Sequence, residues 1–89
     1  MKINIKIYLV RERYIELMEG INHKELLNNI EDLSVSDMIQ NAKDLLARYR
    51  DKESPLYVKY NDKEKYNAWK SHTRKLDRFL IAYPEHLIV

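Results

Sequence analysis

Residues 62–83, DKEKYNAWKSHTRKLDRFLIAY, say most about the fold of this 89-residue chain, because their pattern predicts one long helix. Apolar or weakly polar side chains recur there at alternating steps of three and four residues, at Tyr66, Trp69, Thr73, Leu76, Leu80 and Tyr83. Such steps form a coiled-coil-like seam along one side of a helix. The helix should end before Pro84, and the N-D-K-E sequence at 61–64 predicts a capping box made by Asn61 and Glu64.

Two further helical patterns precede this segment. The clearer one follows Ser34 or Ser36, either of which can cap a helix, and ends before Pro55; its apolar positions are Val35, Met38, Ile39, Ala42, Leu45, Leu46 and Tyr49. We expect Trp69 to be buried against the Met38–Leu45–Leu46 face of this helix. The earlier pattern is a stripe that Gly20 should end, at Val10, Tyr14, Leu17, Met18 and Ile21.

The remaining segments indicate a short helix and some strand. Asn22 could cap the short helix, whose apolar positions are Leu26, Leu27, Ile30 and Leu33. Residues 3–9 alternate isoleucine or leucine with polar residues and tyrosine, which is typical of a half-buried strand. Residues 56–60 and 86–89 could add two more short strands. We therefore predict a single domain, residues 1–89, with a helix-dominated α+β fold of three to four helices, an N-terminal strand and a small sheet edge.

Composition limits the class of protein. Hydrophobic residues make up 45% of the chain and the net charge is only +2, which argues against disorder. No apolar run is long enough to span a membrane, and the lysine-bearing N-terminus does not look like a signal peptide. The chain has no cysteine, which fits a reducing compartment, so we expect a cytoplasmic protein.

The residues that catalysis and metal binding need are scarce. A single glycine cannot build a phosphate-binding loop. The three histidines, His23, His72 and His86, fall on three different predicted segments, and none has a second ligand at zinc spacing on one helix face. We therefore predict that the chain is not an enzyme, that it has no catalytic or metal-binding residues and that it uses no cofactor.

A basic stripe is the main candidate for a binding site. It lies opposite the apolar seam of the 62–83 helix and consists of Lys63, Asn67, Lys70, Arg74 and Arg78. Three interpretations are open: a solvated helix face, a track for a phosphate backbone, or a contact for an acidic protein surface. Asp77 lies near one edge of the stripe. The acidic stretch at 16–44, with seven acids against two lysines, argues against a nucleic acid close by.

Residues 2–33 resemble the ribbon-helix-helix family of DNA-binding proteins. The resemblance rests on K-I-N-I-K-I at 2–7, a following helix, and G-I-N-H-K-E-L-L at 20–27. It implies an N-terminal strand that pairs in a dimer and turns Lys2, Asn4 and Lys6 toward the major groove. The first helix is about one turn shorter than the family needs, and residues 34–89 have no counterpart, so we do not assign the chain to this family.

These observations support two functions. The first is a non-enzymatic protein-binding module, of the inhibitor or adaptor kind, whose partner has an acidic surface. The alternative is a nucleic-acid-binding regulator that uses the basic stripe, the N-terminal strand or both. The exposed edge of that strand and the helical seam also predict a homodimer. Short chains rich in lysine, isoleucine and asparagine are frequent in phages, other viruses and plasmids, so such an origin fits the composition.

Overall fold

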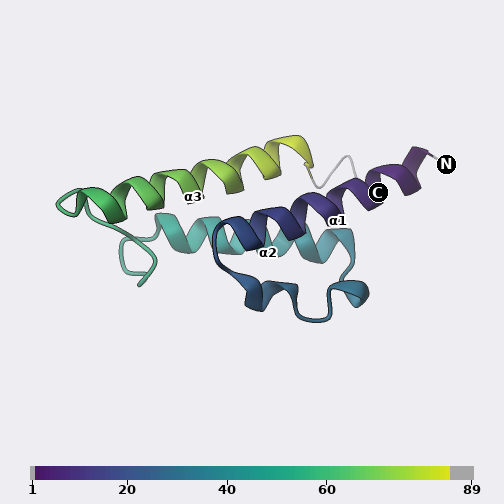
Figure 1. Ribbon diagram of the computed structural model, residues 1–89, viewed down its shortest axis with the longest axis horizontal. Helices are drawn as coiled ribbons and strands as arrows, with labels where there is room; N and C mark the ends of the chain where they lie inside the picture. The colour runs from purple at the N-terminus through teal and green to yellow at the C-terminus, as the bar shows by residue number, and fades with distance from the viewer. Residues whose placement is uncertain (1, 85–89) are drawn as a thin grey trace.

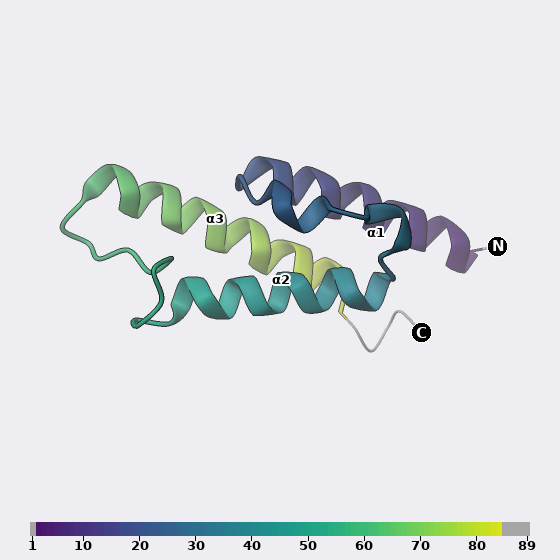
Figure 2. The same ribbon diagram turned by 90° about the horizontal axis from the view of Figure 1, so that it is seen from below.

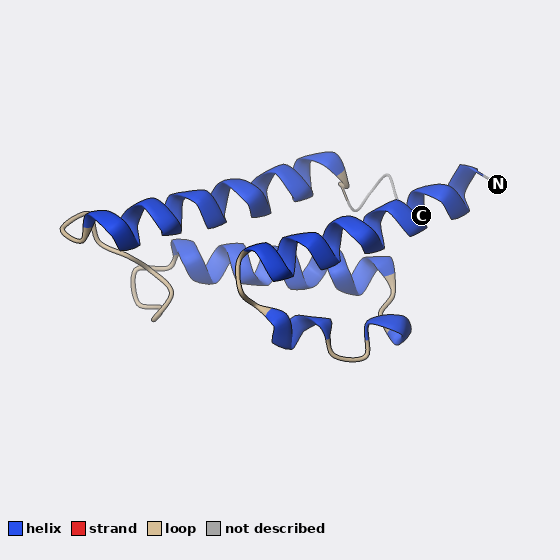
Figure 3. Ribbon diagram, in the orientation of Figure 1, coloured by secondary structure: helices blue, strands red, loops and turns tan. Residues whose placement is uncertain are grey.

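Three long α-helices make up most of the chain. The structure is a computed structural model that describes the backbone of residues 2–84 and the side chains of residues 8–84. Two short 3-10 helices lie between the first two α-helices, and the order is α1 Lys2–Gly20, η1 Lys24–Leu27, η2 Ile30–Asp32, α2 Val35–Arg50 and α3 Lys63–Ala82. No strand occurs between residues 2 and 84 (Figure 3). The predicted α+β class is therefore wrong, and the fold is helical.

The predicted N-terminal strand is replaced by the first two turns of α1. Residues 2–9 continue the helix that carries the stripe beginning at Val10. A strand needs a neighbour to pair its backbone groups, whereas a helix pairs them within itself. The structure offers no such neighbour in its described part. The strand face proposed for Lys2, Asn4 and Lys6 therefore does not exist, and the resemblance to ribbon-helix-helix proteins fails at its first element.

The second predicted strand, at residues 56–60, is part of an irregular loop between α2 and α3. Serine and aspartate side chains organise this loop as turns. Ser54 Oγ accepts the backbone N–H of Leu56 at 3.2 Å, and Asp51 Oδ1 accepts that of Glu53 at 3.0 Å. These local bonds compete with an extended backbone. The third predicted strand, at 86–89, lies outside the described residues.

The three α-helices lie lengthwise against one another in an elongated bundle. Helices α1 and α2 run in the same direction and α3 runs opposite to both (Figures 1 and 2). Because α1 and α2 are parallel, the chain between them travels back along the outside of the bundle, and η1 and η2 form this return (Figure 2). The first turns of α1 project beyond the ends of α2 and α3 (Figure 1).

The core confirms the apolar stripes predicted for α1 and α2. Every residue of both stripes is buried: Val10, Tyr14, Leu17, Met18 and Ile21 in α1, and Val35, Met38, Ile39, Ala42, Leu45, Leu46 and Tyr49 in α2. The short helix expected at residues 22–33 forms instead as η1 and η2. Its apolar side chains, Leu26, Leu27, Ile30 and Leu33, are half-buried against the core.

Helix α3 buries or half-buries every position of the predicted seam and adds Phe79 to it. Thr73 and Leu76 are buried as expected, but the next buried residue is Phe79, and Leu80 is only half-buried. Helix α3 packs against both α1 and α2, so its buried stripe is broader than a two-helix seam. Phe79 contacts α1, with its ring centroid 6.2 Å from that of Tyr14.

Trp69 packs against the core cluster that includes Met38, Leu45 and Leu46, but it is half-buried and not largely buried as predicted. Because α3 is antiparallel to α2, the first half of α3 meets the last turn of α2. Trp69 Nε1 donates a hydrogen bond to the carbonyl oxygen of Tyr49 at 2.7 Å. Its ring also stacks on that of Tyr66 at 5.6 Å and meets the ring of Tyr57 edge-on at 5.8 Å.

The helix ends explain where each helix begins and stops. Ser34 caps α2 in a capping box: Asp37 N–H donates to Ser34 Oγ at 3.0 Å, and Ser34 N–H donates to Asp37 Oδ2 at 3.4 Å. Asp62 caps α3 by accepting the N–H of Lys65 at 3.2 Å. The capping residue of α3 is therefore Asp62, one residue after the Asn61 that the sequence predicted.

Helix α1 ends at Gly20 as predicted, but the residue that turns the chain is Asn22, which has a positive φ of 61°. The N–H of His23 donates to the carbonyl of Met18 at 2.8 Å, and that of Asn22 donates to Glu19 at 3.2 Å. These two bonds form a Schellman motif with Asn22 in its left-handed position. Asn22 therefore ends α1 and does not cap the following helix.

The left-handed conformation of Asn22 leads to a stability prediction. Asn22→Ala should lower the free energy of unfolding by about 1 kcal/mol, because a Cβ-bearing residue without a short polar side chain is strained at positive φ. Asn22→Gly should leave it unchanged or raise it slightly. Thermal or urea unfolding of the two variants measures the difference. Equal stability of the two variants would contradict the assignment.

Candidate binding surface

The five residues of the basic stripe lie on the outer face of α3. Lys63, Asn67, Arg74 and Arg78 are exposed and Lys70 is half-buried, whereas Thr73, Leu76 and Phe79 face the core. A shallow depression of about 330 Å³ follows the stripe, and its lining residues are Asn67, Lys70, Ser71, Arg74, Lys75 and Arg78. The lining contains four cations and no carboxylate.

Asp77, the acid closest to the stripe, is turned toward α2. Its Oδ2 atom lies 3.9 Å from Nη2 of Arg50, the last residue of α2. Both side chains are about half exposed, so this ion pair adds little to stability. The ion pair does, however, turn the carboxylate of Asp77 toward α2 and away from the stripe. The stripe is therefore more uniformly positive than the sequence suggests.

A second hollow, a groove of about 430 Å³, lies between α1 and α3. Leu17 from α1 and Phe79 from α3 supply buried apolar side chains to it, and Gly20 and Ala82 contribute little bulk. Charged side chains also line the groove, namely Arg13, Glu16, Lys75 and Arg78. Lys75 and Arg78 belong to the depression on α3 as well, so the two hollows are continuous.

The charge around the groove is predominantly positive. Arg13 Nη1 and Glu16 Oε2 form an ion pair at 2.8 Å on the exposed surface of α1. The hydrogen bond to Glu16 raises the pKa of Arg13 further above its ordinary value. Among the described lining residues Glu16 is the only acid, so three cations stand against one carboxylate, which is already paired with Arg13. The sequence did not point to Arg13 or Lys75. Arg13 belongs to α1 and reaches this surface only because α1 packs on α3, and Lys75 lies on α3 outside the five positions of the stripe.

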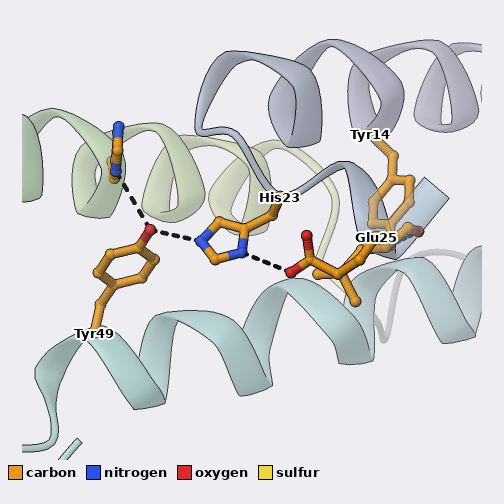
Figure 4. Close-up of polar contacts among 6 residues, drawn as sticks. Tyr14, His23, Glu25 and Tyr49 are labelled. Atoms are coloured by element: carbon orange, nitrogen blue, oxygen red, sulfur yellow. Dashed lines mark hydrogen bonds and ion pairs between the residues drawn. The ribbon is translucent and has the colours of Figure 1, made fainter. Parts of the chain in front are cut away.

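Away from this surface, a row of hydrogen bonds links the segment between α1 and α2 (residues 21–34, the connector) to α2 and α3. His23 Nδ1 lies 2.9 Å from Glu25 Oε2, and His23 Nε2 lies 2.7 Å from the hydroxyl of Tyr49 (Figure 4). The same hydroxyl lies 3.3 Å from Nδ1 of His72 on α3. Residues 23, 49 and 72 belong to three separate elements, so no local spacing in the sequence could have shown that they meet.

The hydrogen bonds of this row have a consistent direction when both histidines are neutral. The Glu25 carboxylate accepts from His23 Nδ1, which leaves His23 Nε2 as an acceptor for the Tyr49 hydroxyl. The hydroxyl oxygen can then accept from Nδ1 of His72. The Tyr49 hydroxyl thus donates to one ring and accepts from the other, so both of its hydrogen-bonding roles are used.

Several pKa values along the row are shifted. Burial lowers the pKa of His72, and the positive charges of Lys75 and His23 add to this effect. Burial raises the pKa of Tyr49, and the hydrogen bond from His23 lowers that of Glu25. These shifts describe a histidine that resists protonation at the α2–α3 contact. Within residues 2–84, no three histidines, acids or cysteines lie close enough to hold a metal ion.

The length and hydropathy of the helices show whether any of them could cross a membrane. Of the helices in the described part of the chain, none is both long and apolar enough to cross a bilayer.

The alternative site from the sequence consists of Lys2, Asn4 and Lys6. These residues lie on the projecting first turns of α1, away from the groove and the α3 stripe (Figure 1). The structure thus brings the α3 residues together and leaves the N-terminal set apart.

The lowered pKa of His72 predicts a loss of stability on mild acidification. In the pH range just below the ordinary histidine pKa of about 6.5, the unfolded chain binds a proton more readily than the folded chain, so the free energy of unfolding should fall there. His72→Gln should reduce this fall, as measured by urea unfolding at pH 7.5 and 5.5. Glu25 does not interfere, because its lowered pKa matters only below about pH 4.5. An equal fall in wild type and variant would contradict the prediction.

No family model, no curated protein and no solved structure matches the chain.

Proposed function

We propose that this chain is a non-enzymatic protein-binding module, of the inhibitor or adaptor kind, whose partner presents an acidic amphipathic segment. The observation that carries the proposal is the groove between α1 and α3. Its apolar side chains, Leu17 and Phe79, are bordered by Arg13, Lys75 and Arg78. A protein segment with apolar residues on one side and carboxylates beside them matches both features.

The apolar part of the groove supports a protein partner. A volume of about 430 Å³ can take one or two large apolar side chains, which is how an amphipathic helix anchors itself in a groove. Such buried anchors supply most of the affinity in protein interfaces. A phosphate backbone has no group that would fill an apolar hollow.

The cations around the groove support an acidic partner. Arg13, Lys75 and Arg78 are spread over both helices, so carboxylates on either side of a bound segment would find a positive neighbour. Exposed charges of this kind mainly accelerate association and exclude partners of like charge. The rest of the stripe, from Lys63 to Arg74, extends the positive surface along α3.

Nucleic-acid binding is the second candidate, and the depression on α3 favours it. Lys70, Arg74, Lys75 and Arg78 line that depression without any carboxylate. By the rise of an α-helix, positions 70 and 78 are about 12 Å apart, so cations at these positions could follow several phosphates. Of the acidic stretch at 16–44, the part between α1 and α2 lies on the other side of the bundle from α3 (Figure 1), whereas Glu16 lines the same groove as Arg78.

Composition supports our proposals for the cellular location and the origin of the chain. A cytoplasmic location is supported by the absence of cysteine, which suits a reducing compartment. A phage, viral or plasmid origin is supported only by the lysine-, isoleucine- and asparagine-rich composition.

The groove can be tested with a synthetic partner. A labelled 15-residue peptide that carries leucines at helical spacing flanked by glutamates should bind, as measured by fluorescence anisotropy. Ala82→Trp should weaken this binding by about tenfold or more, because a large ring placed in the groove would occupy the space of an apolar anchor. Lys75→Gln should slow association more than it speeds dissociation.

Two controls separate the groove from general charge attraction. Ile81→Trp adds the same ring at the neighbouring position, which is 73% exposed and does not line the groove, and it should leave affinity unchanged. A scrambled peptide with the same charge should bind much more weakly. Equal binding of the scrambled peptide, or equal effects of the two tryptophan substitutions, would refute the proposal.

Homodimer formation also remains a proposal, although its basis changes. The edge strand is absent and part of the α3 seam is used inside the bundle, but the projecting part of α1 exposes Tyr8 (63%) and Leu9 (41%). Apolar side chains on a projecting helix can pair with a second copy. Light scattering at high micromolar concentration should give the mass of two chains, and Leu9→Glu should return it to one. A wild-type monomer would reject this proposal.

A further inference from the structure

A third hollow, of about 440 Å³, lies where the α2–α3 loop enters α3. Its lining combines two aromatic rings, two cations and two amides: Tyr60, Tyr66, Lys63, Lys70, Asn61 and Asn67. We call it the Tyr60 pocket. It is at the opposite end of α3 from the groove, which is lined by residues near Ala82. The Tyr60 pocket and the depression on α3 share Asn67 and Lys70 in their linings, so the two hollows adjoin.

The aromatic rings of the pocket are held in place although one of them is exposed. Tyr60 is 79% exposed, yet its ring contacts that of Tyr66 edge-on at a centroid distance of 4.9 Å. Tyr66 stacks on Trp69, and Trp69 is anchored by its hydrogen bond to the carbonyl of Tyr49. A ring with this exposure has an uncovered face. The supported row of rings therefore offers a stacking surface with little ordering to lose on binding.

The pocket is positive and also contains hydrogen-bonding amides. Lys70 Nζ lies 5.7 Å from the centre of the Tyr66 ring, and Lys63 lines the same hollow. Asp62 and Glu64 flank Lys63 in the sequence, and neither is among the described residues that line the pocket. Asp62 accepts the N–H of Lys65 at the start of α3 and lies 4.0 Å from the ammonium group of Lys65. The described lining residues therefore include no carboxylate that would repel a phosphate.

We propose that the Tyr60 pocket binds one nucleotide of a single-stranded nucleic acid. The base stacks on Tyr60, Asn61 and Asn67 provide donors and acceptors for its edge, and the lysines neutralise the adjoining phosphates. Stacking platforms beside a positive groove are the usual means of single-strand binding. An acidic peptide would need an aromatic residue at one position to cover Tyr60, whereas every nucleotide carries a ring and a phosphate together, and a neutral sugar would leave the lysines without a partner.

The strand continues from the pocket along α3. Lys70 belongs to both hollows, and Arg74 and Arg78 follow it at one-turn intervals on the exposed face. Phosphates beyond the stacked nucleotide therefore meet one cation per turn of helix. This inference rests on nucleic-acid binding, the second function proposed above. It adds to that function the stacked base and the path that the strand takes along α3. It does not depend on the groove.

The test uses the full chain and fluorescein-labelled ten-nucleotide oligothymidylate and oligouridylate. Binding should be measurable by anisotropy at 50 mM salt and should weaken steeply as salt rises. Tyr60→Ala should weaken binding by at least about fivefold, because stacking of one base is lost. Tyr60→Phe should keep most of the affinity, since stacking does not need the hydroxyl. Arg74→Gln should flatten the salt dependence by about 0.7 in slope.

Matched controls decide between the possible outcomes. Lys24→Gln removes an exposed cation from η1, outside both hollows, and should leave binding unchanged. Circular dichroism checks that each variant keeps its helices. If the oligomers bind but Tyr60→Ala equals wild type, the pocket is refuted while nucleic-acid binding stands. If a free mononucleotide binds as tightly as the oligomers, the strand track is refuted. If no oligomer binds, both this inference and the second function fall.

Discussion

The parallel arrangement of α1 and α2 is the constraint on which the rest of the structure depends. Two parallel helices require the chain between them to return along the bundle, and this connector contains only two short 3-10 helices. Such segments have little stability of their own. Hydrogen bonds to its backbone and side chains therefore have to hold it. The fully buried Tyr14 supplies one, by donating from its hydroxyl to the carbonyl of Leu26 at 2.8 Å while it accepts from Asn41 at 3.0 Å.

Tyr49 holds the connector at a second point through His23, and Arg11 adds a third link to the carbonyl of Leu33 at 3.5 Å. Both tyrosine hydroxyls are satisfied within the bundle, as buried polar groups must be. Burial raises the pKa of each phenol, so both stay protonated and able to donate. Because Tyr49 also contacts His72, the connector, α2 and α3 meet at one hydroxyl. The buried tyrosines thus join elements that apolar packing alone would leave loosely connected.

Helix α3 serves packing and surface chemistry with opposite faces. Its inner face packs on α1 and α2, and its outer face carries the cations. Along its length, the two ends of α3 meet different neighbours. At its first turns the α2–α3 loop places Tyr60 beside Tyr66, and at its last turns α1 places Arg13 and Leu17 beside Phe79. The connector between α1 and α2, which carries Glu25, Glu31 and Asp32, lies across the bundle from this surface (Figure 1), while Glu16 of α1 lines the groove itself.

The sequence by itself determined the stripes of α1 and α2, the basic face of α3 and the ends at Gly20 and Pro84, because helical periodicity and helix-breaking residues act over a few positions. It misplaced residues 2–9, where an alternating pattern suits a strand only if a partner strand exists. Only the tertiary structure decided that Phe79 is buried and that Arg13 and Lys75 line one groove. It also brought His23, Tyr49 and His72 together. These features depend on which helices meet and in which direction, and that information lies in contacts between residues far apart in the chain.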